Sequence, residues 1–234
     1  MLAQFVPNEK RGHVNSGWLT SAHSFSFARY VNPERRNFGA LLVVNEDTIA
    51  PGAGFGEHPH DNMEIVTIPL SGALRHEDSM GNKGVIRAGE FQAMSAGTGV
   101  LHSEVNASET EPVHLLQLWI WPNRQNPAQR YKQWNAAIPQ NGFVTVAAPE
   151  PGNHFDIYQD AWISFGAWNT GSAFTVEKTE EGRGTFLLLV SGRGRLGGFA
   201  MKAGDGFEAS GAPAFTFTAE EDCRVLKIDV PMDV

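Results

Sequence analysis

Cysteine is nearly absent from this chain of 234 residues. The single thiol, Cys223, excludes an intramolecular disulfide, a cysteine-rich zinc site and a cysteine-ligated iron–sulfur cluster. Because it lies in a strand-like apolar run, "CRVLKIDV" at 223–230, we expect it to be a buried core residue.

Positive charge and long apolar runs are also scarce. Lys and Arg number 18 against 26 for Asp and Glu, which gives a formal net charge of −8. Such a chain lacks the basic surface that binds a phosphate backbone, so we expect no direct nucleic-acid partner. No run of 18 apolar residues occurs, and the opening "MLAQFVPNEKRGHVNSGW" has no apolar signal segment. We therefore expect no membrane partner and a cytoplasmic location.

Helical patterns are rare, and short strand-like runs dominate. Twenty-five glycines and thirteen prolines separate these runs, which include "ALLVVN" (40–45), "MEIVTIPL" (63–70), "HLLQLWIW" (114–121) and "TFLLLVS" (185–191). Short runs rich in β-branched and aromatic residues, bounded by turns, predict an all-β sandwich or barrel. One helix is predicted, over "NPAQRYKQW" at 126–134, because Asn126 can cap it and Pro127 fits its first position.

Two halves of the chain share one order of elements. "PLSGAL" (69–74) precedes "AGEFQAMSAG" (88–97) and "HLLQLWIWP" (114–122), just as "LVSGRG" (189–194) precedes "AGDGFEASGA" (203–212) and "CRVLKIDVP" (223–231). This repetition predicts two tandem β-barrels, which we assign to residues 1–135 and 136–234. The later half also contains G-x-G-x-x-G at 192–197, but no helical pattern follows it, so we interpret it as a hairpin turn rather than a nucleotide-binding loop.

Two pairs of candidate metal ligands lie in the first half. His58 and His60 are two positions apart in "GEHPHDNME" (56–64), as are His102 and Glu104 in "GVLHSEVN" (99–106). On a strand, side chains at i and i+2 point to the same face. If both strands face one barrel interior, they supply three imidazoles and a carboxylate. Such a set suits Fe, Mn, Co, Ni, Cu or Zn better than Mg or Ca.

These stretches resemble the pirin family of the cupin superfamily. The resemblance covers roughly residues 10–122, through "RGHVNSGWLTSAHSFSFARY" (11–30), "GAGFGEHPHDNMEIVTIPLSGAL" (52–74) and the segment that ends in "GVLHSEVN". It implies a bicupin, a pair of cupin-type barrels, with one divalent metal ion, iron in the first instance, in the N-terminal barrel. The C-terminal barrel has no histidine after His154 and is expected to lack ligands.

The resemblance also implies a ligand set. In pirins the H-x-H and H-x-E pairs bind the metal, which here gives His58, His60, His102 and Glu104. The general cupin pattern would use Glu64 instead, which also fits its spacing from the H-x-H pair. We prefer Glu104 as the ligand and expect Glu64 to orient a ligand imidazole. A buried, hydrogen-bonded core acid is the alternative for Glu64.

Other residues near these motifs receive weaker assignments. Phe55, Met63, Phe91 and Met94 border the ligand pairs and are candidates for an apolar substrate pocket. Trp119 and Trp121 share one strand face, and core packing explains them. The remaining histidines are expected to be structural or surface residues, with His76 exposed near the turn "SMGNKG" (79–84); they are His13, His23, His76, His114 and His154.

The activity that pirin resemblance implies is an oxidoreductase, a quercetin 2,3-dioxygenase. A flavonol hydroxyl beside a carbonyl binds the metal once it is deprotonated, and Glu104 is our candidate for the base. The partners would then be a small aromatic substrate and O₂, with ring opening and loss of carbon monoxide. Two alternatives stay open: a metal- and redox-responsive regulator that acts through a protein partner, and a cupin isomerase or decarboxylase that uses another substrate.

Overall fold

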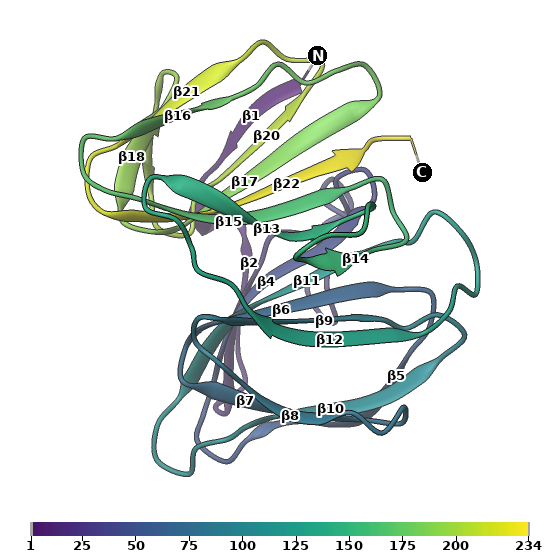
Figure 1. The fold of residues 1–234 in the computed structure, drawn as a ribbon. Coiled ribbons are helices and arrows are strands. Elements are labelled where there is room, and N and C mark those ends of the chain that lie inside the picture. Colours follow the sequence, from purple (N-terminus) through teal and green to yellow (C-terminus); the bar gives the residue numbers. More distant parts are fainter. Residues whose placement is uncertain (1, 234) are drawn as a thin grey trace.

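Two β-barrels follow one another in space, as the repeated order of motifs predicts (Figure 1). The computed structural model describes residues 2–233. The N-terminal barrel contains β2 (Gly12–Asn15), β3 (Leu19–His23), β4 (Leu41–Ile49), β5 (Gly54–His60), β6 (Glu64–Ser71), β7 (Ala73–Asp78), β8 (Lys83–Arg87), β9 (Glu90–Ser95), β10 (Val100–Asn106), β11 (Val113–Ile120) and β12 (Arg130–Asn135). The C-terminal barrel contains β1 (Leu2–Val6), β13 (Gly142–Ala148), β14 (Phe155–Asp156), β15 (Trp162–Trp168), β16 (Ala173–Val176), β17 (Arg183–Ser191), β18 (Arg193–Leu196), β19 (Phe199–Lys202), β20 (Gly206–Ser210), β21 (Phe215–Ala219) and β22 (Cys223–Pro231).

Strands β4–β11 and β15–β22 are arranged in the same order in the two barrels. Each pairs a seven-stranded sheet, β12-β9-β6-β11-β4-β3-β2 or β1-β20-β17-β22-β15-β13-β14, with a four-stranded sheet, β5-β10-β7-β8 or β16-β21-β18-β19. The repeated Ser-Gly turns occupy equivalent places, since Gly72 links β6 to β7 and Gly192 links β17 to β18. Both glycines have positive φ, 74° and 84°. The G-x-G-x-x-G stretch forms the β18–β19 hairpin, as predicted.

Strand periodicity places the main core between the two seven-stranded sheets. On β6 and β17 alternate residues such as Val66, Ile68, Phe186 and Leu188 belong to one apolar cluster that both barrels share. The opposite face of β17 points into the C-terminal barrel, whose interior is apolar and includes the buried Cys223, as expected. The opposite face of β6 points into the N-terminal barrel.

One edge strand crosses from the N-terminal part of the chain to the C-terminal barrel. β1 lies early in the chain but pairs with β20 of the C-terminal barrel, from Leu2 opposite Ser210 to Val6 opposite Gly206. Figure 1 shows it beside β20, away from the strands that follow it. β12, the last strand before the connection to β13, pairs with β9 of the N-terminal barrel. Our proposed division at residue 135 therefore falls between β12 and β13, with β1 crossing to the other barrel.

The helix predicted over 126–134 is wrong. Asn126 has a positive φ of 50°, and residues 130–135 form strand β12 on the free edge of β9. Tertiary contacts override the local helix signals here. The strand pairs its backbone with β9 and also packs Trp134 on Phe91, with ring centroids 5.6 Å apart. In the described part of the chain the one helical element is the 3-10 turn Asn8–Lys10, and no helix there has the length and apolar character to cross a membrane.

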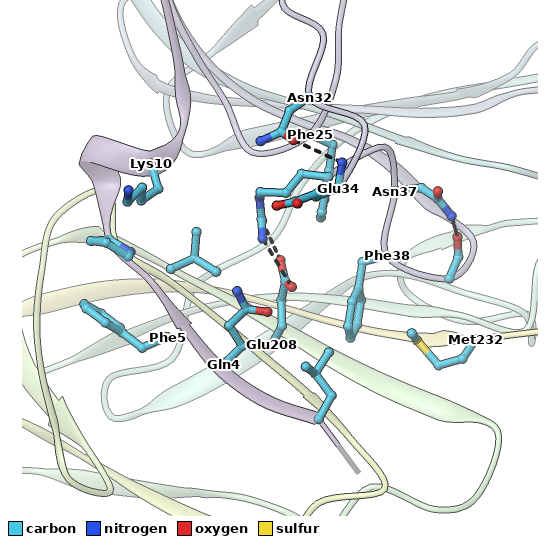
Figure 2. Close-up of a pocket in the computed structure, with 15 residues that line it drawn as sticks. Gln4, Phe5, Lys10, Phe25, Asn32, Glu34, Asn37, Phe38, Glu208 and Met232 are labelled. Carbon is cyan, nitrogen blue, oxygen red and sulfur yellow. Dashed lines mark hydrogen bonds and ion pairs between the residues drawn. The ribbon is translucent and has the colours of Figure 1, made fainter.

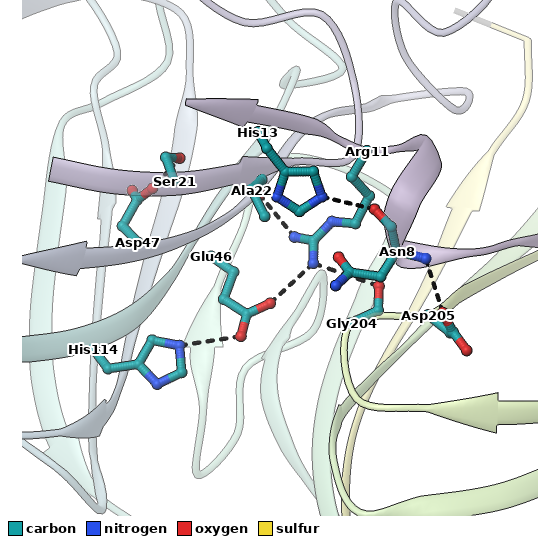
Figure 3. A network of polar contacts seen from close by, with 10 residues as sticks. All are labelled: Asn8, Arg11, His13, Ser21, Ala22, Glu46, Asp47, His114, Gly204 and Asp205. Carbon is teal, nitrogen blue, oxygen red and sulfur yellow. Dashed lines mark hydrogen bonds and ion pairs between the residues drawn. The ribbon is translucent and has the colours of Figure 1, made fainter. Parts of the chain in front are cut away.

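A buried arginine also joins the barrels (Figure 3). The Arg11 side chain is 1% exposed, and its Nη1 donates to Glu46 Oε2 at 2.9 Å. Its Nη2 donates to the Ala22 carbonyl at 2.7 Å, and Nη1 lies 3.5 Å from the carbonyl oxygen of Gly204 in the C-terminal barrel. This guanidinium therefore bonds to both barrels at their junction.

Candidate metal centre

Strand β10 carries the later ligand pair between strands β5 and β7. His102 lies opposite His58 on β5, and Glu104 lies opposite His76 on β7. The β5 register shifts between His102 and Glu104, which marks a bulge of the kind that often re-aims side chains beside active sites. The H-x-H and H-x-E pairs therefore meet on one sheet of the N-terminal barrel.

The three predicted histidines come together. The ring centroid of His102 lies 4.4 Å from that of His58, and both lie 4.9 Å from that of His60. One ring nitrogen of each lies within 4.8 Å of the others. His58 Nδ1 is 2.8 Å from the Gly56 carbonyl oxygen, so a proton on Nδ1 leaves Nε2 free as a ligand atom.

The fourth predicted ligand, Glu104, lies deeper. Its side chain is 4% exposed, and its carboxylate accepts hydrogen bonds from Gln117 Nε2 at 2.9 and 3.2 Å and from Thr67 Oγ1 at 3.2 Å. Both donors come from the opposite, seven-stranded sheet. A carboxylate oxygen of Glu104 groups within 4.8 Å with nitrogens of His102 and His76. His102 thus links the three imidazoles to the carboxylate.

Burial keeps two of these imidazoles neutral at neutral pH. It lowers the pKa of His60 to about 4, and nearby His102 and His58 act in the same direction. It likewise lowers the pKa of His102 to about 3, with His58 and His76 as further causes. Only the neutral imidazole binds a metal ion, so these side chains are already in the ligand form.

The donors fit a transition-metal ion. Both ring nitrogens of His102 are buried, and neither has a hydrogen-bond partner among residues 2–233. Leaving a buried polar atom unpaired costs about 1–3 kcal/mol, which a bound ion would offset. Imidazole nitrogens with a carboxylate oxygen suit a first-row transition metal.

The position of Glu64 argues against the expectation that it orients a ligand imidazole. It shares the face of β6 that carries Val66 and Ile68, which belong to the core between the sheets, whereas Thr67 on the opposite face contacts Glu104. Its carboxylate accepts a 2.6 Å hydrogen bond from Ser95. The geometry therefore supports the alternative of a buried core acid, and Thr67 and Gln117 orient Glu104 instead.

The four predicted pocket residues divide between two faces. The assignment of Phe91 to the pocket is wrong, because its face of β9 points into the core between the sheets, where it packs on Trp134 and Phe165. Met94, on the opposite face, joins Met63 in an apolar cluster inside the N-terminal barrel. Phe55 lies 6.3 Å from His58 between ring centroids. The sequence did not tell which face of β9 is the inner one.

Aromatic rings lie around the histidines, and three of them were not assigned to the site from the sequence. Trp119, assigned to the core from sequence, packs edge-on against His60 at 4.7 Å and 81°. Phe27 packs edge-on against Trp119 at 5.3 Å, and Trp18 does so against Phe55 at 5.2 Å. The partly exposed imidazoles thus lie among aromatic side chains.

The predicted exposure of His76 is the largest error made for an individual residue. We expected it to be exposed, but it is fully buried on β7. Its Nε2 lies 3.2 Å from Asp78 Oδ2, and its ring stacks on Tyr131 at 5.0 Å. The stretch "HED" repeats the H-x-acid spacing of His102 and Glu104, and this signal could have revealed it.

A separate cavity of about 700 Å³ lies where β1 meets the segment before β4 (Figure 2). Phe25 and Phe38 form part of its wall, and Arg35 crosses it to pair with Glu208 at 2.6 Å. None of the four predicted ligands is among its lining residues within the described chain. The cavity is therefore no evidence for the candidate metal centre, which is assigned from the positions of its nitrogen and oxygen donor atoms.

Comparison with known sequences settles the family. The family model described as Pirin matches residues 5–120, and the model described as a quercetinase C-terminal cupin domain matches residues 145–230. A protein of Escherichia coli K12 named quercetin 2,3-dioxygenase is 39% identical over 222 residues, which cover 95% of this chain and 96% of that protein. The chain belongs to the pirin family.

Solved structures agree with this assignment. The bacterial pirin YhhW of Escherichia coli, crystallised in complex with nickel(II), matches this pirin with a TM-score of 0.93 and 38% identity, and each chain is fully covered. A quercetin 2,3-dioxygenase of Acinetobacter baumannii has the same fold, with a TM-score of 0.76 at 22% identity over 98% of this chain and 86% of that one. The two-barrel pirin fold expected from the sequence is thereby confirmed.

Proposed function

We propose that this pirin binds one divalent transition-metal ion, iron in our working assignment, and cleaves the ring of a flavonol such as quercetin with O₂. His58, His60, His102 and Glu104 would hold the ion. When bound, it supplies Lewis acidity toward a ring hydroxyl and redox chemistry toward O₂. One O₂ is consumed and one carbon monoxide released for each flavonol opened to an ester.

The carboxylate of Glu104 accepts the proton of the substrate hydroxyl. Gln117 and Thr67 donate hydrogen bonds to it, and these fix its position. A buried base held in this way loses little energy to solvent reorganisation when the proton arrives.

Aromatic side chains beside the histidines hold the planar substrate. Trp119 and Phe55 border His60 and His58 respectively, and Phe27 packs on Trp119. Such rings offer offset-stacked and edge-on contacts to another ring system. The observation that carries the proposal is this combination of neutral imidazoles, an oriented carboxylate and an aromatic border in one barrel.

The decisive experiment measures stoichiometric turnover. Purified protein is loaded with Fe(II) without oxygen, elemental analysis gives its metal content, and quercetin and air are then added. We expect flavonol loss, O₂ uptake and carbon monoxide release in equal amounts. Full metal loading without turnover, for Fe(II) and for Ni(II) alike, would refute the proposed activity.

A matched pair of variants separates the two roles of Glu104. Glu104→Gln keeps an oxygen donor and the hydrogen bond from Gln117, so we expect it to retain much of the metal while turnover falls by about 10²–10⁴-fold. Glu109→Gln removes an exposed carboxylate just beyond β10 and should behave as the parent protein. If Glu104→Gln loses metal and turnover to the same degree, Glu104 is a ligand and not the base.

A further inference from the structure

The pair of His76 and Asp78 has no role in the proposed reaction. Both side chains are fully buried on β7, and they point into the N-terminal barrel toward β10. The ring centroid of His76 lies 5.3 Å from that of His102. The flat face of the ring rests on Tyr131, which fixes its plane.

Hydrogen bonds around Asp78 decide which nitrogen of His76 is free. Asp78 Oδ1 accepts the backbone N–H groups of Met80 at 2.9 Å and Asn82 at 3.0 Å, and the Asn82 side chain donates to both oxygens. Each of these partners is an N–H donor, so the Asp78 carboxylate acts as an acceptor at both oxygens. His76 Nε2, 3.2 Å from Oδ2, then donates to it as well. In the neutral ring Nδ1 then carries a lone pair.

This lone pair has no hydrogen-bond partner among the described residues, and the atom is buried. Asp78 holds the other ring nitrogen, as carboxylates commonly do behind metal-binding histidines. One nitrogen of His76, one of His102 and one carboxylate oxygen of Glu104 lie within 4.8 Å of each other. Glu104 is itself fixed from behind by Gln117. Each donor in this group is thus oriented or left unpartnered.

We propose that His76, His102 and Glu104 form a second, inner binding position for a divalent transition-metal ion. It rests on the proposed function, because His102 and Glu104 belong to both positions and a single ion occupies one position at a time. The outer position, which adds His58 and His60 to this shared pair, lies nearer to solvent, since His58 and His60 are partly exposed.

Charge favours the inner position for a buried ion. There a dication meets the carboxylate of Glu104, and Asp78 lies directly behind His76. Glu104 is shared with the outer position, so the added negative charge of Asp78 behind His76 is what distinguishes the inner one. Charges in a low-dielectric interior are stable when they are paired and their lone pairs are satisfied. The inner set meets both conditions with residues at most 4% exposed.

The test removes the outer histidines and asks whether binding survives. We would titrate Co(II) into the metal-free full chain by calorimetry, and record its visible absorption and the elemental content after dialysis. The parent protein should bind one ion. The double variant His58→Ala/His60→Ala should still bind one ion, and adding His76→Gln should weaken that binding by at least about 100-fold. His13→Gln, an exposed histidine, is the matched control.

Asp78→Asn in the same double background gives a test that keeps His76. It should lower Co(II) affinity by about 10–100-fold, because the group that orients the ring and raises its basicity is weakened. Thermal unfolding of the metal-free forms shows whether each variant is folded. Crystals of the Co(II)-loaded double variant should give an anomalous peak between His76, His102 and Glu104.

The outcomes separate this inference from the proposed function. If the parent protein binds one ion and the double variant binds none, the inner position is wrong while the proposed metal centre stands. Undiminished binding after His76→Gln or Asp78→Asn in that background would also overturn it. If the parent protein binds no ion, the proposed function fails, and the inner position fails with it.

Discussion

Replacing Glu64 with glutamine should stabilise this pirin above neutral pH. Glu64 is 1% exposed, and burial raises its pKa to about 7. Hydrogen bonds from Ser95 and the Tyr158 backbone, and the charge of Arg130, lower the pKa but do not offset burial. The glutamine side chain keeps an oxygen for the Ser95 hydroxyl and carries no charge at any pH.

The sign and size of the effect follow from proton linkage. Between about pH 4.5 and pH 7 the unfolded chain has released the Glu64 proton while the folded chain retains it, so stability falls as pH rises through this window. With about 1.4 kcal/mol for each pKa unit between the two states, the loss reaches roughly 3 kcal/mol above pH 7. Glu64→Gln removes this loss. The advantage of the variant should therefore be near zero at pH 4.5 and largest at pH 8.

Urea denaturation of the metal-free protein at several pH values measures this difference directly. The comparison needs a surface control, and Glu150→Gln removes an exposed carboxylate of the same charge. We expect the control to follow the parent protein at every pH. Parallel stability curves for Glu64→Gln and the parent protein, or a less stable variant at pH 8, would refute the reasoning about burial.

Three further changes test other parts of the molecule. Gly192→Ala should lower the free energy of unfolding by well over the roughly 1–2 kcal/mol that a left-handed alanine costs, since the new Cβ would lie 2.3 Å from a backbone oxygen. Gly171→Ala, at φ 81° with open space around it, should cost only that backbone strain. Thermal unfolding of both variants measures the difference. Gln117→Leu should lower metal affinity or turnover by about 10–100-fold in dialysis and rate assays, because Glu104 loses its main donor; an unchanged rate would contradict this. Arg11→Met should destabilise the chain by about 3 kcal/mol in urea, since it leaves a partly buried carboxylate without its cation, and coincident curves would contradict it.

The two-residue spacing within each ligand pair predicted more of the candidate metal centre than the amino-acid composition did. An i, i+2 pair on a strand must share a face, so His58 with His60 and His102 with Glu104 were each assigned as units. That the units meet depends on β5 lying beside β10, a pairing over about forty residues that only the family resemblance suggested. His76 carried the same spacing to Asp78 but was judged by its nearby turn, and the cross-strand register with Glu104 was not visible in the sequence.

Local sequence could not predict which face of a strand points into the barrel or which segment pairs with the edge of a sheet. Phe91 and Met94 are three positions apart on β9, so one points to the core between the sheets and the other into the barrel. Nothing in their neighbourhood distinguishes the two faces, because both are apolar. The segment over 126–134 has good helix signals, yet residues 130–135 pair along the edge of β9, which places Trp134 against the core between the sheets. In both cases a distant strand decides the outcome.

The repeated fold explains how the chain tolerates a polar barrel. β21 of the C-terminal barrel is equivalent to β10, but its inward Phe217 belongs to a closely packed apolar interior. Burial of such side chains stabilises by about 1.5–3 kcal/mol each, whereas the N-terminal interior holds unpaired atoms of His76 and His102 that destabilise it. The core between the seven-stranded sheets and the crossing strand β1 connect the two barrels. The apolar barrel can therefore stabilise the fold as a whole, and this allows the interior of its neighbour to hold polar groups without hydrogen-bond partners.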